Sequence, residues 1–259
     1  QRSLVGSEMC IRDRSGSFVA GKGASLGDVA IGSSFSVTLT AMDDCQLLII
    51  ARGYGSSNYT VGSLKDKSLS SVQGTTAPAS TIEGITTEGG VNAMPYILHL
   101  PYVNVTEDGR IESPEGSDIR ILLRRLATRL TVAWENLPDN TGYDLRQVML
   151  QSIPVEYKLL PDNKDSYPSP LDQYRTIQVS NVTNKGQYTC WAPAVVREES
   201  ANATSDYYRT KANAPKGSAY ATFISQHKTD NKKKLNYRVY LGGNSSKDFS
   251  LRDNPNYIY

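Results

Sequence analysis

Apolar and polar residues alternate along much of this chain, which is the pattern of half-buried β-strands. Residues 34–40 (SFSVTLT) place three apolar side chains on one face and hydroxyl side chains on the other. Residues 45–51 (CQLLIIA) form a continuous apolar run ended by Arg52 and Gly53, which indicates a strand buried on both faces. Further short strand-like segments lie between polar, Gly and Pro turns, at residues 145–153, 174–182, 186–191, 219–226, 235–241 and 249–251. This spacing predicts an all-β protein made of β-sandwiches.

Residues 118–134 (DIRILLRRLATRLTVAW) fit either a helical stripe or one face of a strand. We favour the strand, because its continuation LTVAW is β-branched and aromatic and ends at a polar, proline-containing turn. Upstream, Asp108 and Gly109 predict a hairpin between residues 102–105 and a strand that begins at Ile111. Residues 53–93 are rich in Gly, Ser and Thr and predict loops, with weak strands or a short helix near residues 61–72.

Three prolines among polar residues make residues 161–173 (PDNKDSYPSPLDQ) the best linker in the chain. We therefore predict an N-terminal sandwich at residues 15–163, a Pro-rich linker at 164–173 and a C-terminal sandwich at 174–259. The fold class expected is two tandem transthyretin-like or Ig-like β-sandwich domains. Because the chain stops at Tyr257, Ile258 and Tyr259 inside a strand-like segment, we expect the C-terminal strands to be incomplete, like the N-terminal ones.

The first fourteen residues (QRSLVGSEMCIRDR) do not have the unbroken apolar run of a secretory signal. Back-translation of residues 8–14 gives DNA that resembles the transposase end used in preparing sequencing libraries, and residues 3–7 fit the adjoining adapter arm. We expect residues 1–14 to be a translated adapter on a metagenomic fragment, with the native gene cut off before Ser15. Cys10, Arg12 and Arg14 then carry no function.

Charge argues against a nucleic-acid or membrane-surface binder. The net charge is +2, and it falls to +1 without residues 1–14, which contain three arginines and two acidic residues. The basic run at residues 232–234 follows Asp230 and Asn231 and indicates a solvated hairpin tip. No apolar run reaches the roughly 18 residues of a membrane-spanning helix.

The residues that could carry catalysis or bind metal do not form a recognisable motif. Residues 16–22 (GSFVAGK) match most of a phosphate-binding loop, but Gly23 stands where that loop needs Ser or Thr, and no strand or helix pattern flanks it. His99 and His227 are the two histidines, and neither has the spacing of a zinc site or of a catalytic triad. We therefore predict no catalytic, cofactor-binding or metal-binding residues, no cofactor and no enzymatic activity.

Cysteine and tyrosine are the two residue types that bear on burial and on a surface role. Cys45 and Cys190 lie in separate apolar segments and are expected to be buried thiols, with a disulfide as the minor alternative. Tyrosine is abundant, with 16 residues against 4 Phe, and many lie in the C-terminal half. Tyrosine suits interfaces because it combines apolar area with a polar tip, although ordinary strand composition explains its abundance equally well.

Several segments resemble fimbrillin-like proteins of Bacteroidales, the type V pilin superfamily. The resemblance runs from about Phe35 to the end and rests on residues 97–101 (ILHLP), 118–130 (DIRILLRRLATRL), 190–197 (CWAPAVVR), 200–203, 207–211 (YYRTK), 213–215, 219–224, 240–244 (YLGGN), 248–249 and 252–254. It implies export as a lipoprotein to the outer membrane and assembly into surface fimbriae as shaft, anchor or tip. It also implies polymerisation by strand exchange after an Arg-specific protease removes an N-terminal strand. No cleavage arginine or donor strand can be assigned to a numbered residue here.

The leading hypothesis is therefore a non-enzymatic structural or adhesive fimbrial subunit at the cell surface. It assembles by donor-strand complementation with other fimbrial subunits, and contacts the membrane only through a lipidated N-terminus outside this chain. The alternative is a surface β-sandwich that binds glycans or other host ligands through exposed Tyr and Trp; a row of coplanar exposed aromatic rings would favour it. A hydrolase with an unrecognised site is a third hypothesis, which converging carboxylates in a deep pocket would support.

Overall fold

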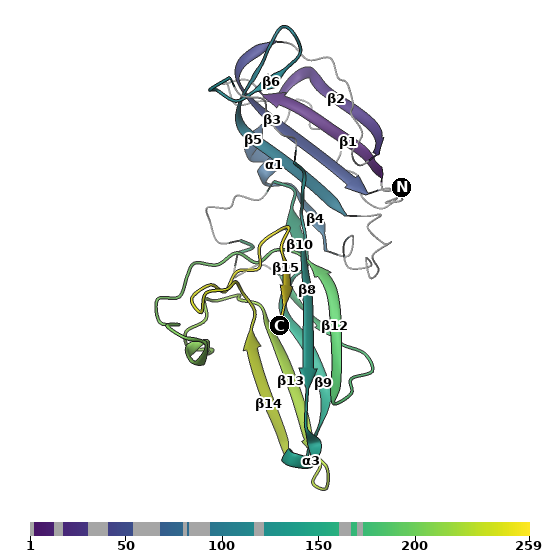
Figure 1. Ribbon diagram of the computed structural model, residues 1–259, viewed down its shortest axis with the longest axis vertical. Coiled ribbons are helices and arrows are strands. Elements are labelled where there is room, and N and C mark those ends of the chain that lie inside the picture. The colour runs from purple at the N-terminus through teal and green to yellow at the C-terminus, as the bar shows by residue number, and fades with distance from the viewer. Residues whose placement is uncertain are drawn as a thin grey trace. The chain divides into compact units, whose positions relative to one another are not determined.

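The computed structural model describes residues 3–12, 18–30, 41–53, 68–79, 82, 94–116, 122–160, 167–169 and 173–259, with the backbone alone at 3–12, 18–30 and 51–53. The chain divides into two compact units. Unit 1 contains residues 1–126 and 158–161, and unit 2 contains residues 127–157 and 162–259. Figure 1 labels their helices and strands. The elements are mostly β-strands, which confirms the predicted all-β fold.

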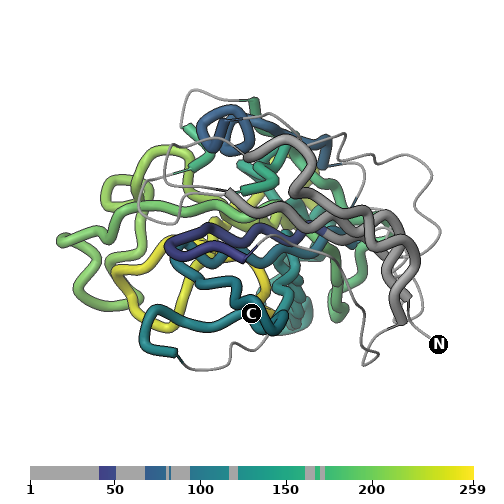
Figure 2. The backbone as a smooth tube through the Cα atoms, turned by 90° about the horizontal axis from the view of Figure 1, so that it is seen from above, coloured from purple at the N-terminus to yellow at the C-terminus, as the bar shows by residue number. Residues whose placement is uncertain are grey.

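Unit 1 is built on a six-stranded sheet with the order β2-β1-β3-β5-β6, in which β7 also pairs with β5. Its strands are β1 (Ser3–Arg12), β2 (Phe18–Ala30), β3 (Met42–Gly53), β5 (Pro95–Val105), β6 (Ile111–Glu112) and β7 (Arg124–Arg125). All of these pairings are antiparallel, and Figure 2 shows β3 and β5 running side by side. β1 falls within the segment expected to be a translated adapter, and it pairs with both β2 and β3.

The apolar run in β3 is buried on both faces, as the sequence predicts. Leu47 and Leu48 are adjacent residues on opposite faces, and both are 0% exposed. One face packs in a cluster with Val103 and Val105 of β5. Unit 1 also contains the short helix α1 (Leu69–Gln73) and the strand β4 (Thr76–Pro78). The strand β10 (Glu156–Lys158) lies where the chain passes from residues of unit 2 to residues of unit 1. The helix α1 overlaps the end of the region near residues 61–72 where the sequence predicts a short helix or weak strands, of which the structure describes 68–72.

The predicted Asp-Gly hairpin joins β5 to β6. Gly109 has φ +84°, a left-handed conformation that glycine adopts without strain. The Thr106 hydroxyl accepts a hydrogen bond from the Arg110 N–H at 2.9 Å, which closes the turn. Hydrogen bonds donated by Thr106 and Arg110 lower the pKa of the Asp108 carboxyl below its usual value. The local sequence therefore fixes this turn through both backbone conformation and side-chain hydrogen bonds.

Unit 2 is a sandwich of a four-stranded sheet and a three-stranded sheet. The first has the order β11-β9-β13-β14 and the second the order β12-β8-β15. The elements are β8 (Thr128–Glu135), α3 (Pro138–Thr141), β9 (Tyr143–Pro154), β11 (Tyr174–Gln178), β12 (Lys185–Ala192), the 3₁₀ turn η2 (Asp206–Tyr208), β13 (Tyr220–His227), β14 (Lys234–Tyr240) and β15 (Asn256–Ile258). Leu130 and Val132 of β8 face Leu150 of β9 and Ala221 of β13 across the core.

Most strands of unit 2 confirm the sequence prediction. The ambiguous segment at 118–134 ends in the strand β8, not in a helix, because Leu130 and Val132 point into the core while Thr131 and Ala133 point away from it. The predicted strand at 249–251 is wrong: Leu251 makes only an isolated bridge with Val195. The predicted strand at 34–40 lies outside the described residues.

The compact units divide at a different point from the predicted linker at 164–173. The change from unit 1 to unit 2 comes after Leu126, and the strands of residues 127–157 belong with the C-terminal strands. The reason is long-range pairing, because β8 pairs with β12 and β9 pairs with β13. Part of the predicted linker is itself fixed in unit 2, where Tyr167 exchanges backbone hydrogen bonds with Val196 at 3.1 and 2.7 Å.

Candidate partner-binding groove

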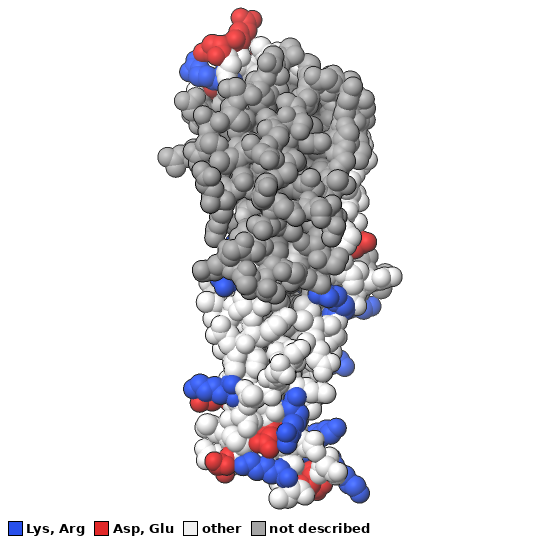
Figure 3. Space-filling model, turned by 90° about the vertical axis from the view of Figure 1, so that its right-hand side faces the viewer, with Lys and Arg blue, Asp and Glu red and all other residues white. Residues whose placement is uncertain are grey.

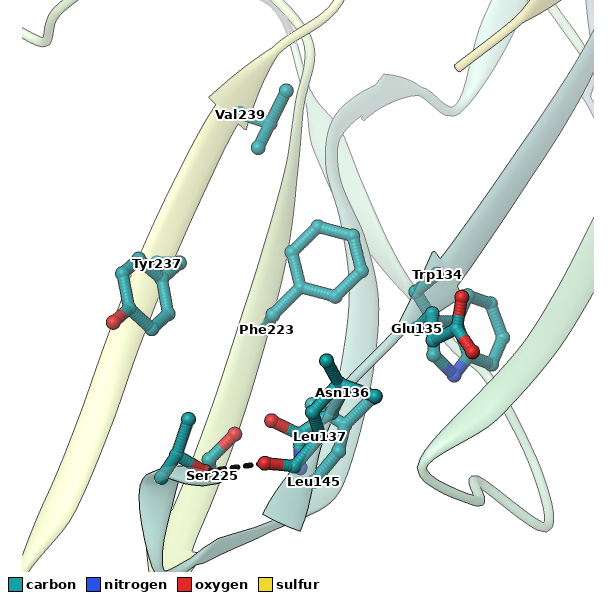
Figure 4. A pocket seen from close by; sticks show the side chains of 10 residues that line it. Trp134, Glu135, Asn136, Leu137, Leu145, Phe223, Ser225, Tyr237 and Val239 are labelled. Carbon is teal, nitrogen blue, oxygen red and sulfur yellow. Dashed lines mark hydrogen bonds between the residues drawn. The ribbon is translucent and has the colours of Figure 1, made fainter. Parts of the chain in front are cut away.

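An open groove of about 560 Å³ lies between the two sheets of unit 2 (Figure 4). Its lining is mainly apolar and combines the end of β8, the following corner, and the inner faces of β13 and β14. The lining residues are Trp134, Glu135, Asn136, Leu137, Thr141, Leu145, Phe223, Ser225, Tyr237 and Val239. In Figure 4 Phe223 lies between Trp134 on one side and the strand that carries Tyr237 and Val239 on the other.

One wall of the groove is an incompletely paired edge of β8. β15 runs parallel to β8 and pairs with residues 129–131 only, and the last bond of this ladder joins the Ala133 N–H to the Tyr259 carbonyl at 2.9 Å. On the opposite edge, the Asn136 N–H donates to the Asn184 carbonyl at 2.6 Å. Because ladder groups alternate between the two edges, the N–H and C=O of Glu135 face the groove side. Within the described residues, no strand pairs with β8 at Glu135 on that side.

The facing wall is the inner side of β13 and β14. The rings of Trp134 and Phe223 meet edge to face at 6.5 Å, so β13 lies opposite β8. β14 is the strand next to β13, so it lies opposite the β15 side of β8. β15 pairs with β8 over three residues. Tyr237 is 60% exposed and Val239 is 46% exposed, although both follow the inward-facing alternation of their strand. In the part of the chain that the structure describes, no strand covers this apolar sheet face.

Trp134 is held in a fixed position in the groove wall. Its indole N–H donates to the Thr183 carbonyl at 2.9 Å. It sits opposite Gly186 in the β8–β12 ladder, where an added Cβ would come within 2.7 Å of the indole ring. Glycine at this position therefore allows the ring to lie close to the neighbouring backbone. The groove has a preformed aromatic surface, which lowers the entropic cost of binding.

The corner at the closed end of the groove is fixed by paired amide side chains. The Asn184 carbonyl oxygen Oδ1 accepts from the Leu145 N–H at 2.8 Å and from the Asn136 amide at 2.9 Å. The Asn136 amide also donates to the Tyr143 carbonyl at 2.7 Å. These partly buried hydrogen bonds join the end of β8 to the start of β9 and fix the corner that carries Leu137 and Leu145.

β15 is anchored by the hydroxyl group of Tyr259. This hydroxyl donates to the Gly242 carbonyl at 2.7 Å and accepts from the Gly242 N–H at 2.9 Å. Burial raises the pKa of the Tyr259 phenol well above its usual value. The Tyr257 and Tyr259 rings are parallel within 3°, with their centroids 6.3 Å apart. The short parallel strand is therefore held by side-chain hydrogen bonds as well as by its backbone ladder with β8.

Charged side chains of both signs surround this end of unit 2, and Figure 3 shows blue and red intermingled there. Lys228 donates to Asp139 at 2.8 Å, and Lys185 lies 3.1 Å from Glu135. The hydrogen bond from Lys228 lowers the pKa of the Asp139 carboxyl, and the same bond raises the pKa of Lys228. Exposed pairs of this kind contribute little stability, and Glu135 is the one charged residue among the described residues that line the groove.

The residues that the sequence analysis weighed for chemistry have structural roles. His99 contacts the Gln46 amide oxygen at 3.1 Å, and His227 packs edge to face on Tyr143 with centroids 4.9 Å apart. Cys45 and Cys190 are buried thiols, as predicted. Phe18 to Gly23 of the loop-like motif lie in β2. Among the described residues, no group of three or more His, Cys, Asp or Glu is arranged to hold a metal ion, and no helix has the length and apolar character to cross a bilayer.

Comparison with known proteins gives the fold. The tip fimbrial protein Mfa3 of Porphyromonas gingivalis, in a C-terminally truncated form, matches with a TM-score of 0.58 and 17% identity, over 100% of this chain and 88% of that one. A protein described as a cell adhesion protein of Parabacteroides distasonis matches at 0.55 and 9%, over 99% and 80%. A fimbrilin of P. gingivalis matches at 0.54 and 10%, over 98% and 82%. At these identities the likeness shows a shared fold.

Sequence comparison adds one local match. Residues 190–259 match a domain of unknown function, DUF4906. The curated proteins contain no significant match to this chain. The matched segment includes β13, β14 and β15, and thus one wall of the groove.

Sequence reasoning did not find the groove. The sequence predicts strands within residues 118–134 and at 235–241, and in the second of them Tyr237, Val239 and Leu241 alternate with Arg238 and Tyr240. That alternation was a usable signal, because it defines an apolar face. Local sequence does not show which segment of the facing sheet lies over this apolar face, and that segment decides whether the face is buried or open.

Proposed function

We propose that this protein is a non-enzymatic structural or adhesive subunit of cell-surface fimbriae, and that its unit 2 groove receives an extended strand from another subunit. The proposal rests on one observation in particular: Tyr237 and Val239 form an apolar, inward-facing surface that is 60% and 46% exposed, beside an edge of β8 that no described strand pairs with at Glu135. Similarity in fold to a tip fimbrial protein and to a fimbrilin supports it.

Strand addition fits the chemistry of both walls. An added strand would hydrogen-bond to the backbone of β8 at Glu135, and each such bond contributes about 1 kcal/mol net. Its inward side chains would pack against Phe223, Tyr237 and Val239, and cross-strand apolar pairs contribute roughly 0.2–1 kcal/mol each. The occupant is therefore a strand with apolar residues at every second position and polar residues between them.

The proposal places the protein at the cell surface, with other fimbrial subunits as its partners. It extends to polymerisation triggered by an Arg-specific protease, as the fimbrillin resemblance implies. Shaft, anchor and tip roles differ in how many strand-exchange contacts one subunit makes, so an assembly assay separates them. A tip subunit makes one contact, whereas a shaft subunit makes two and forms polymers.

The test is incorporation into fibres. The protein, carrying an epitope tag, is produced in a fimbriated host cell, and sheared surface fibres are probed for the tag before and after treatment with an Arg-specific protease. We expect the tag in the fibre fraction, and we expect Tyr237→Ser to reduce its amount at least several-fold while the soluble protein stays folded. A tag that never enters fibres, or that enters equally well with Tyr237→Ser, contradicts the proposal.

A further inference from the structure

A second surface of unit 2 presents two exposed tyrosines on an ordered connection. Residues 193–219 join β12 to β13, and η2 within this connection carries Tyr207, which is 84% exposed, and Tyr208, which is 48% exposed. The two rings meet edge to face, with centroids 5.4 Å apart and planes at 87°. Large aromatic side chains this exposed are characteristic of binding surfaces when the backbone that carries them is rigid.

The backbone beside the two tyrosines is fixed by Arg209. Its guanidinium donates to the carbonyls of Ser245, Ser246 and Asp248 at 3.2, 2.7 and 3.0 Å, and to those of Tyr240 and Leu241 at 3.2 Å each. The same group stacks on the Phe249 ring, 4.2 Å from its centroid. Burial lowers the pKa of Arg209, which shows that the charge is partly removed from water. A long connection is thereby joined to the end of β14.

Three further hydrogen bonds close the connection on itself and on the neighbouring turn. The Asn213 amide donates to the Tyr208 carbonyl at 2.9 Å, and the Ser200 hydroxyl donates to the Asn213 carbonyl at 2.6 Å. The Ser246 hydroxyl donates to the carbonyl of Ala203, which is fully buried. Because this backbone is already ordered, a ligand that contacts the two rings pays little conformational entropy.

The chemistry around the two rings favours a neutral, hydroxylated ligand. Residues 198–217 contain three acidic and three basic residues, so the surface attracts neither anions nor cations overall. The same stretch contains no Leu, Ile, Val, Met or Phe, so the two tyrosine rings are its large apolar surfaces. Asp206 and Ser205 beside them supply a carboxylate and a hydroxyl for hydrogen bonding. Aromatic rings of this kind stack on the C–H faces of sugar rings.

We propose that Tyr207 and Tyr208 form a binding site for neutral carbohydrate, separate from the groove and independent of strand addition. One tyrosine ring stacks on a sugar ring, the second closes the side of the site, and Asp206 accepts hydrogen bonds from sugar hydroxyls. A protein ligand would require a larger apolar contact area than this connection offers.

The experiment is a glycan array probed with the 259-residue chain, followed by titration of the strongest neutral oligosaccharide. We expect binding to neutral hexose- or N-acetylhexosamine-terminated glycans. The Tyr207→Ala/Tyr208→Ala double variant should lose at least about tenfold in affinity, with an unchanged melting temperature. Tyr207→Phe should retain most of the affinity, because the ring remains. Tyr102→Ala removes a comparably exposed tyrosine, 67% exposed in unit 1, and should change nothing.

Each contrary outcome is distinct. No binding to any neutral glycan, or binding that the double variant retains, overturns the proposal, as does a preference for sialylated or sulfated glycans. Binding to a host protein after its glycans are removed also overturns it. Tyr237→Ser, which alters the groove, should leave glycan binding intact, so failure of this site and failure of the fimbrial assembly role are separable.

Discussion

The two flanks of the unit 2 sandwich have the same alternating pattern and opposite exposure. On the closed flank, Leu130 and Leu150 face each other across the core and are 0% and 1% exposed. On the open flank, Tyr237 and Val239 also point inward, yet they are 60% and 46% exposed. Within the described residues, the facing sheet covers Leu130 and Leu150, and no strand of it lies over Tyr237 and Val239. Alternation thus determines which face turns inward, and the neighbouring strand determines whether that face is buried.

The open flank combines two features that strand recognition needs. A sandwich that leaves an apolar face and an unpaired strand edge open in the same place provides both components of strand recognition, the backbone ladder and the side-chain packing. The aromatic wall is fixed by Gly186 and by the hydrogen bond from Trp134 to Thr183. The open flank is therefore an ordered surface.

The largest effect is expected in the closed flank. Leu150→Ala should lower the free energy of unfolding by about 2–5 kcal/mol, because the vacated volume is enclosed on all sides. Urea denaturation measures this directly. A loss below about 1 kcal/mol would show that the closed flank is not the packed core that its burial indicates.

A smaller loss is expected where β15 is anchored. Tyr259→Phe leaves both backbone groups of Gly242 without their hydroxyl partner and should cost about 1–3 kcal/mol. Because the pKa of Tyr259 is raised in the folded state, its contribution is fully present below the unfolded pKa of about 10 and is lost as the pH rises above it. Tyr257→Phe is the matched control, since its hydroxyl accepts one exposed hydrogen bond, from the Arg252 N–H. Equal losses in the two variants would contradict this anchoring role.

Substitution in the open flank should barely affect stability. Val239→Ala and Tyr237→Ser are expected to change the free energy of unfolding by no more than about 0.5 kcal/mol, since Tyr237 is 60% exposed and Val239 is 46% exposed. The same urea experiment applies. A loss comparable to that of Leu150→Ala would mean that the groove is closed in solution.

The smallest effect concerns the ion pair beside the groove. Lys228 lowers the pKa of Asp139, so the pair stabilises the fold above the unfolded pKa of about 3.9, and this contribution disappears as the pH falls through the folded pKa. Asp139→Asn should be slightly less stable than the parent at pH 7 and indistinguishable from it in strong acid. Salt should shrink the difference, because both groups are exposed. A gap that persists at pH 2 would exclude this explanation.

Local sequence predicted the elements better than their partners. The residues of β8 and the Asp108–Gly109 turn contain their own signals, namely β-branched residues and a dipeptide that adopts a left-handed conformation. The division into units escaped prediction because it depends on pairing between β8 and β12, whose residues lie more than 40 positions apart. A proline-rich stretch indicates a loop, but it does not indicate which unit that loop belongs to.

The groove and the surface at Tyr207 and Tyr208 could not be predicted from the sequence, for the same reason. The sequence does not distinguish Arg209 from the other arginines. The fold brings its guanidinium to five carbonyl groups from residues 240–248. Tyr237 reads as an ordinary strand residue, and its exposure depends on which segment of the facing sheet lies over it. Periodicity reports local burial, whereas these features depend on contacts between distant segments.

The most direct test of the central claim is the binding of an extended strand next to Trp134. In a Trp191→Phe background Trp134 is the remaining tryptophan, so its fluorescence reports on the groove. The probe is a capped peptide that alternates Val and Thr over seven residues between terminal lysines, with a control peptide that has Pro at its centre and cannot complete a backbone ladder. We expect a saturable fluorescence change with the first peptide and none with the Pro peptide. Tyr237→Ser should weaken binding of the first peptide at least about tenfold. Equal responses to both peptides, or no response to either, would contradict it.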